Sequence, residues 1–161
     1  MERPSTPPPT PTLALAALLE RLRKERDRLA GLPGHTEKLG GLTALGQRVE
    51  GLLRATLEAQ WAEHGGADAA FPKMTERSLR YDRASAGQVV YAILASADRG
   101  APAGGVTGAL VAELRAEDSV LCALVSLRNA AVHGREERPA AELIALFDGA
   151  LARLGAVAAA R

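Results

Sequence analysis

The sequence predicts an all-α protein, a single-domain bundle of five or six helices. Hydrophobic residues make up 47% of the 161 residues but aromatic residues only 3%. A core of leucine, alanine and valine suits packed helices better than a β-sandwich. Apolar residues recur at three- and four-residue steps along most of the chain, which is the spacing of one helical face. No segment has a convincing strand pattern, and the length fits one core.

The N-terminal residues are expected to lie outside this domain. Residues 3 to 12 are rich in proline, which lacks an amide hydrogen and cannot continue a helix. We therefore expect residues 1 to 12 to form a disordered arm and residues 13 to 161 to form the helical domain. Thr12 can cap a first helix that runs to about Ala30. Its inward face consists of leucines, at Leu15, Leu18, Leu19, Leu22 and Leu29.

A second, longer helix is predicted after Gly34 and up to about His64, because apolar residues again recur at helical spacing. Several glycines interrupt this pattern. A glycine inside a helix costs about 1 kcal/mol relative to alanine. We therefore expect either a break near residues 40 and 41 or close helix contacts at Gly46 and Gly51.

Residues 65 to 82 form a connection without clear periodicity, longer than most loops of a compact domain. This connection and its edge carry the basic and aromatic side chains that a single-stranded RNA site uses. We expect its basic residues to bind RNA; the alternative is a solvated surface loop. The basic residues are Lys73, Arg77, Arg80 and Arg83, and the aromatic ones are Phe71 and Tyr81.

Three further helices follow the connection. Ser85 and Gln88 match a capping box, which opens a helix to about Asp98. A glycine- and proline-rich turn then leads into a helix over residues 106 to 115. Pro139 is suited to a first helical position and starts the final helix.

The helix between these last two is predicted to start near Asp118 or Ser119, and it carries the most informative pattern of the chain. Five residues share one face of it, and all except Arg128 are apolar. A guanidinium keeps its charge, so at a core position it needs a paired anion, a solvated cleft or an interface. The alternative is that its aliphatic stem packs on this face while its head reaches solvent. The five residues are Leu121, Leu124, Val125, Arg128 and Val132.

Two polar residues follow on the same helix. Asn129 lies four residues before His133, so its amide can orient the imidazole. Arg128 and His133, in contrast, lie about 140° apart around a regular helix. One helix cannot easily bring both groups to one phosphate. A second copy of the chain, or unwinding at the helix stop Gly134, could do so.

The pattern Arg128-Asn129-x-x-x-His133-Gly134 resembles the signature of the HEPN superfamily, the Arg-x4-His motif at the end of a helix in a small helical protein. The resemblance covers residues 13 to 158 in architecture and these seven residues in the motif. It implies that the arginine and histidine of two protomers meet across a dimer interface and form one ribonuclease site. Arg128, Asn129 and His133 would then be the catalytic residues.

The resemblance also has a departure. One branch of the superfamily carries a tyrosine two residues after the histidine, where an antitoxin modifies and inactivates it. This chain has Arg135 at that position, so control through that tyrosine is not expected. We include Arg135 among the residues expected to bind RNA.

The motif residues suit the cleavage of RNA without a metal ion or cofactor. RNA carries its own nucleophile, the 2′-hydroxyl, so the protein has to transfer protons and stabilise charge on the phosphate. An unperturbed imidazole titrates near neutral pH, and a guanidinium donates a fixed fork of hydrogen bonds. We therefore expect an endoribonuclease that cuts single-stranded RNA to a 2′,3′-cyclic phosphate, in a toxin–antitoxin, anti-phage or CRISPR-linked system. Its protein partners would be a second copy and an antitoxin or defence-complex protein.

Composition excludes several other classes. A net charge of +1 argues against a protein that coats nucleic acid. Cys122 is the only cysteine, so there is no intrachain disulfide and no cysteine-based zinc site. No leader pattern or membrane-spanning apolar stretch is present, which favours a cytoplasmic protein. Two alternatives stay open: a catalytically inactive HEPN-like binding or dimerisation module, and a plain helical adaptor.

Overall fold

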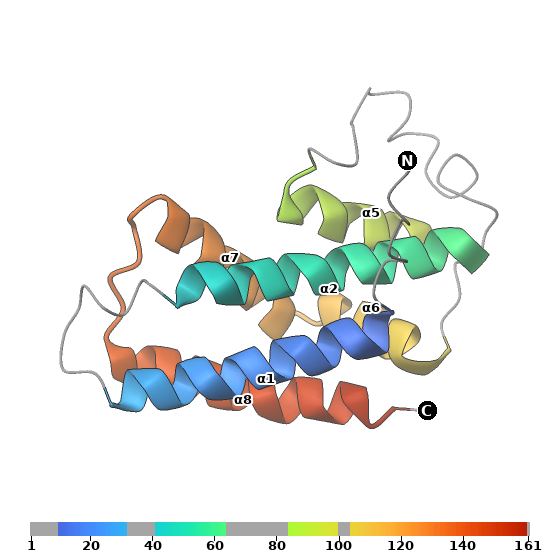
Figure 1. Cartoon of the computed structure of the whole chain (residues 1–161). Coiled ribbons are helices and arrows are strands. Elements are labelled where there is room, and N and C mark those ends of the chain that lie inside the picture. The colour runs from blue at the N-terminus through green and yellow to red at the C-terminus, as the bar shows by residue number, and fades with distance from the viewer. Residues whose placement is uncertain (1–9, 32–40, 64–83, 100–103, 161) are drawn as a thin grey trace, which may run out of the picture.

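The computed structural model describes residues 10–31, 41–63, 84–99 and 104–160. Within these ranges the chain forms six α-helices and no strand (Figure 1), which confirms the predicted all-helical bundle. The helices are α1 (Pro11–Ala30), α2 (Leu42–Glu63), α5 (Ala86–Asp98), α6 (Gly105–Arg115), α7 (Val120–Val132) and α8 (Ala140–Ala158).

The long helix α2 organises the bundle. It packs against α1, α7 and α5, while α8 covers another side of α1 (Figure 1). The short helices α6 and α7 connect the α2–α5 part of the bundle to α8. The motif helix α7 therefore packs between the central helix and the C-terminal one.

The core is built as the composition predicts. Phe147 is the only aromatic residue among the largest fully buried side chains of the described chain, and the others are leucine and isoleucine. The five leucines predicted to face inward from the first helix are all buried. Burial of such side chains stabilises each by about 1.5–3 kcal/mol. The fully buried ones are Leu15, Leu18, Leu22, Leu29, Leu42, Leu52, Leu53, Leu57, Ile93, Leu110, Leu121 and Phe147.

The first helix begins at Pro11, two residues earlier than the start after Thr12 that the sequence predicts. Thr10, and not Thr12, is the N-cap, and its hydroxyl accepts a hydrogen bond from the Leu13 amide at 3.2 Å. Pro11 occupies the first turn. A proline is tolerated there because the first helical amides have no partner within the helix. Residues 1–9 lie outside the described chain.

At the glycines of α2 the structure agrees with some of the expected features and not with others. The described helix begins at Leu42, directly after Gly41, and residues 32–40 lie outside the described chain. A Cβ added at Gly46 would stand 2.4 Å from the Cγ of Arg128, which confirms a close contact there. The expected contact at Gly51 is wrong, since a Cβ there would meet nothing within 4 Å.

The later boundaries agree with the sequence patterns to within a residue. The capping box of α5 is present: the Ser85 hydroxyl accepts from the Gln88 amide at 3.2 Å, and the Gln88 side chain accepts from the Ser85 amide at 2.8 Å. Pro139 is the N-cap of α8 and not its first helical residue. None of the described helices is long and apolar enough to cross a membrane.

Candidate functional site

The N-terminus of the motif helix α7 is fixed by a carboxylate from the preceding helix. Glu113 is buried, and its two oxygens accept hydrogen bonds from the Val120 amide at 2.7 Å and from the Ser119 hydroxyl at 3.0 Å. The Leu121 amide is a third donor, at 3.3 Å. A carboxylate at a helix N-terminus accepts hydrogen bonds from the amides that have no partner within the helix, and its negative charge interacts favourably with the positive end of the helix dipole. These bonds fix both the residue at which α7 starts and the direction in which the helix runs.

The turn that closes the C-terminal end of α7 contains the predicted glycine, Gly134. Gly134 has a φ of +66°, a left-handed conformation that glycine adopts without the cost of a Cβ. The Gly134 amide donates to the Ala131 carbonyl at 3.2 Å, and the Arg135 amide to the Ala130 carbonyl at 2.7 Å. These two bonds form a Schellman motif. His133, which directly follows the last helical residue Val132, is the C-cap of α7 and is exposed.

Arg128 is half-buried against the central helix α2. Its Cβ and Cγ lie against the backbone of Gly46, where a side chain would collide with them. Its guanidinium reaches out of the core, and the side chain keeps 35% of its surface exposed. The aliphatic part thus completes the apolar face of α7, while the charge stays in contact with water.

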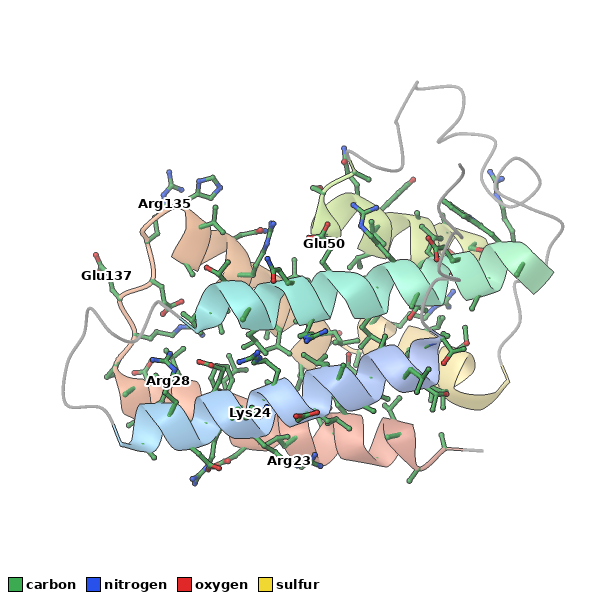
Figure 2. All side chains as sticks on the ribbon, in the orientation of Figure 1. Arg23, Lys24, Arg28, Glu50, Arg135 and Glu137 are labelled. Carbon is green, nitrogen blue, oxygen red and sulfur yellow. The ribbon has the colours of Figure 1, made fainter. Side chains whose placement is uncertain are left out.

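A carboxylate from α2 stands beside this guanidinium. Glu50 Oε2 lies 3.8 Å from Arg128 Nη2. The other oxygen, Oε1, accepts hydrogen bonds from Arg54 Nε at 3.2 Å and from Arg54 Nη2 at 3.1 Å. Figure 2 shows Glu50 on α2, between the end of α7 and the start of α5. We name Glu50, Arg54 and Arg128 the Glu50 cluster.

Sequence reasoning missed the Glu50 cluster. The available signal was the four-residue spacing of Glu50 and Arg54, which places the two on one helical face. That spacing is common on exposed helices, so it did not single out this pair. Only the packing of α7 on α2 brings Arg128 beside Glu50, and the sequence does not show this packing.

Asn129 is bound to Arg128 and not to the imidazole. Its side-chain oxygen accepts a hydrogen bond from Arg128 Nη1 at 3.2 Å, while its backbone carbonyl accepts from the His133 amide at 3.1 Å. The predicted orientation of the His133 ring by this amide is therefore not the arrangement in the single chain. Within the described residues, the amide instead holds one edge of the guanidinium.

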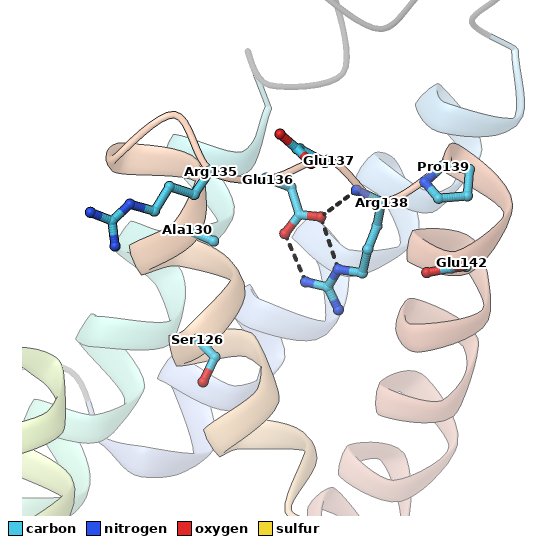
Figure 3. Close-up of a pocket in the computed structure, with 8 residues that line it drawn as sticks. All are labelled: Ser126, Ala130, Arg135, Glu136, Glu137, Arg138, Pro139 and Glu142. Carbon is cyan, nitrogen blue, oxygen red and sulfur yellow. Dashed lines mark hydrogen bonds and ion pairs between the residues drawn. The ribbon is translucent and has the colours of Figure 1, made fainter.

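The other side of α7 borders an open depression of about 630 Å³, which the connection to α8 also lines (Figure 3). Glu136 lines it, is buried and accepts two hydrogen bonds from the Arg138 guanidinium, both at 2.8 Å. The carboxylate raises the pKa of the Arg138 guanidinium above its usual value. Arg135 also lines the depression, and its side chain points away from the Glu136–Arg138 pair.

The other residues predicted to bind RNA, Lys73, Arg77, Arg80 and Arg83, lie outside the described chain. The chain re-enters the described structure at Ala84. The Ala84 carbonyl accepts a hydrogen bond from Arg54 Nη2 at 2.8 Å. Ala84, the first described residue after the predicted connection, is thus bound to the Glu50 cluster.

The described residues contain no group of three or more histidine, cysteine, aspartate or glutamate side chains placed to hold a metal ion. Comparisons of the chain with profiles of protein families, with curated proteins and with solved structures find no match.

Proposed function

We propose that this protein is a HEPN-like, metal-independent endoribonuclease that cuts single-stranded RNA. One observation carries the proposal. The end of α7 presents Arg128, whose side chain is 35% exposed, and the exposed His133, five residues apart. Among the described residues, the nearest carboxylate to this guanidinium is Glu50, at 3.8 Å, so a phosphate can compete for the guanidinium.

Each residue has a role in the proposed reaction. His133 removes the proton of the 2′-hydroxyl and protonates the leaving 5′-oxygen. Arg128 donates to the non-bridging phosphate oxygens, where negative charge builds up in the transition state. Asn129 holds the guanidinium through the bond to Nη1. The products are a 2′,3′-cyclic phosphate and a 5′-hydroxyl.

The proposal includes a two-fold homodimer, or a heterodimer with a related chain. Arg128 faces α2, whereas His133 lies at the exposed end of the helix. Their angular separation of about 140° makes it difficult for one copy to bring both to one phosphate. A two-fold axis beside the end of α7 would bring the Arg128 of one copy to the His133 of the other.

The activity test uses purified protein with single-stranded RNA in EDTA. We expect cleavage of RNA, ends that resist ligation until the cyclic phosphate is opened, and no cleavage of DNA, which lacks the 2′-hydroxyl. His133→Ala and Arg128→Ala should each lower the rate at least about a hundredfold, as expected for loss of a proton-transfer group or a charge contact. Asn129→Ala should cost less, because it acts through Arg128.

Arg23→Ala is a matched control for the removal of an arginine, since Arg23 is exposed on α1. Circular dichroism and light scattering should show unchanged helicity and assembly in all of these variants. Full activity of the His133 variant, or an absolute need for a divalent ion, would contradict the mechanism. A wild type that cuts no RNA, alone or with a partner encoded beside it, would favour the inactive binding module.

A plain helical adaptor is the second candidate, and one observation favours it. The packing of the Arg128 stem on Gly46, with the head directed to Glu50, is also what an arginine with a purely structural role would show. An adaptor would cut no RNA even as the wild type, and Arg128→Ala would leave the stability of its dimer unchanged; RNA cleavage is therefore the measurement that separates it from the ribonuclease.

A further inference from the structure

Glu50 is shared by two arginines, but unequally. Arg54 donates two hydrogen bonds to Oε1, at 3.1 and 3.2 Å, and is itself anchored by the Ala84 carbonyl at 2.8 Å. Arg128 Nη2 stands 3.8 Å from Oε2, beyond the distance of a hydrogen bond. Hydrogen bonds from Arg54 therefore fix the Glu50 carboxylate, whereas Arg128 interacts with it only through the attraction of opposite charges.

Toward the part of the chain that the structure describes, the guanidinium of Arg128 keeps unused donors. A guanidinium fork can bind a carboxylate or a phosphate through two parallel hydrogen bonds. Among the described residues, Arg128 makes one hydrogen bond, from Nη1 to Asn129, and only the longer contact to Glu50. Because a third of the side chain is exposed, an anion can reach the free donors from solvent.

We propose that Glu50 is an internal substitute for the RNA phosphate at Arg128. The inference rests on the proposed phosphate role of Arg128. In the free protein the carboxylate partly neutralises and orients the guanidinium. When a phosphate arrives, Arg128 turns its free donors to it, and Arg54 retains Glu50. Glu50 is thus a positioning residue, and its charge lowers the affinity of the site for phosphate.

Inorganic phosphate is the probe that tests this directly, since it needs neither cleavage nor a particular RNA. Its dissociation constant can be measured by titration, following the side-chain N–H signals of ¹⁵N-arginine by NMR. Glu50→Gln keeps an acceptor for Arg54 but removes the charge, so we expect phosphate to bind roughly tenfold more tightly than to the wild type. Glu50→Ala should change the affinity in the same direction, and adding Arg128→Ala to either variant should abolish binding.

Glu20→Gln is the matched control, because Glu20 is a surface glutamate with a partner four residues away, Lys24, at 3.0 Å. It removes the same charge from a residue whose ion pair is with Lys24 and not with Arg128, and it should leave the phosphate affinity unchanged. Equal affinities of the wild type and Glu50→Gln, or no phosphate binding by a folded Glu50→Gln, would overturn the inference. A purely structural role would lower the melting temperature without changing the affinity.

RNA kinetics separate this inference from the proposed function. If both hold, Glu50→Gln should lower KM roughly tenfold and leave kcat nearly unchanged. Cleavage with an unchanged KM in Glu50→Gln would overturn the inference alone. Tighter phosphate binding by Glu50→Gln in a protein that cuts no RNA would overturn the ribonuclease and leave the anion site standing.

Discussion

Two helical glycines of α2 stand in opposite surroundings, which shows how one residue can position the candidate site. Gly46 lies under the side chain of Arg128, where an added Cβ would be 2.4 Å from Cγ and 3.2 Å from Cβ. Gly51 faces open space, where an added Cβ would meet nothing within 4 Å. Alanine is the better helix former by about 1 kcal/mol, so only the surroundings decide which substitution stabilises.

The first prediction compares these two positions. Gly51→Ala should raise the free energy of unfolding by about 0.5–1 kcal/mol, because the helix gains alanine without a collision. Gly46→Ala should lower it by about 1 kcal/mol or more, since the Arg128 stem and α7 have to move away. Urea unfolding followed by circular dichroism measures both. Equal stabilisation by the two substitutions would show that α7 does not pack closely on Gly46.

Gly46→Ala should also weaken the proposed activity. Displacing the stem of Arg128 moves its guanidinium relative to Asn129 and Glu50, and a misplacement of about 1 Å can cost a hundredfold in rate. The Gly51 variant should cleave RNA at the wild-type rate, which makes it the control for this readout.

At the scale of the element, α7 is held at both ends by contacts that no other helix of the described chain combines. A buried carboxylate caps its first amides, and a left-handed glycine closes its last turn. These contacts fix where Arg128 and His133 leave the helix. Both ends can be weakened by single substitutions that leave the apolar face intact.

The second prediction concerns the C-terminal end. Gly134→Ala should lower the free energy of unfolding by about 1–2 kcal/mol, because a Cβ disfavours the left-handed conformation. Gly134→Asn should cost less, since asparagine tolerates that conformation better. Gly149→Ala on α8 is the control, because a Cβ there meets nothing within 4 Å and φ is not positive. A Gly134→Ala protein as stable as the wild type would show that the turn can rearrange freely.

The third prediction concerns the N-terminal end. Glu113→Gln should lower the free energy of unfolding by about 2–3 kcal/mol, because a buried carboxamide cannot accept all the bonds of the carboxylate. It also loses the charge that faces Arg153 Nη2 at 3.6 Å. Glu117→Gln, at an exposed position beside the same helix end, should change the stability by less than about 0.5 kcal/mol. Chemical denaturation of both variants tests whether Glu113 has this role.

At the scale of the whole molecule, the end of α7 exposes an apolar side chain beside the proposed catalytic pair. Val132 is 59% exposed, although it lies on the same face of α7 as the buried residues Leu121, Leu124 and Val125. Exposed large hydrophobic side chains are few in the described chain, the others being Leu13 and Tyr91. An interface between two copies would cover Val132 and bring two motifs together.

The fourth prediction uses this residue to test the assembly. Val132→Lys should place two like charges near the two-fold axis of the proposed dimer, so we expect that dimer to dissociate and RNA cleavage to fall with it. Leu13→Lys, at a similarly exposed position on α1, should keep both the dimer and the activity. Light scattering after size-exclusion chromatography measures the mass. A monomeric wild type that still cuts RNA would show that no composite site is needed.

The sequence alone determined the helices and most of their ends. Periodic leucines identified the inward face of α1, and the capping box at Ser85 and the glycine at position 134 marked where α5 begins and α7 stops. These features depend on residues within one or two helical turns of one another, so local hydrogen bonding and steric preference decide them. The start of α1 was predicted two residues late, because both Thr10 and Thr12 can cap a helix.

The surroundings of Arg128 were decided only by the tertiary structure. The sequence placed a charge on an apolar face and left open whether Arg128 has a paired anion, a solvated cleft or an interface, or whether its stem packs on that face while its head reaches solvent. The packing of α7 on α2 set the stem against Gly46 and the guanidinium beside Glu50, a residue 78 positions away. Helical periodicity assigns a residue to a face but not the atoms opposite it, because those atoms come from helices distant in the chain. For the same reason, only the folded structure shows that the side chain of Asn129 is bound to Arg128 and not to His133.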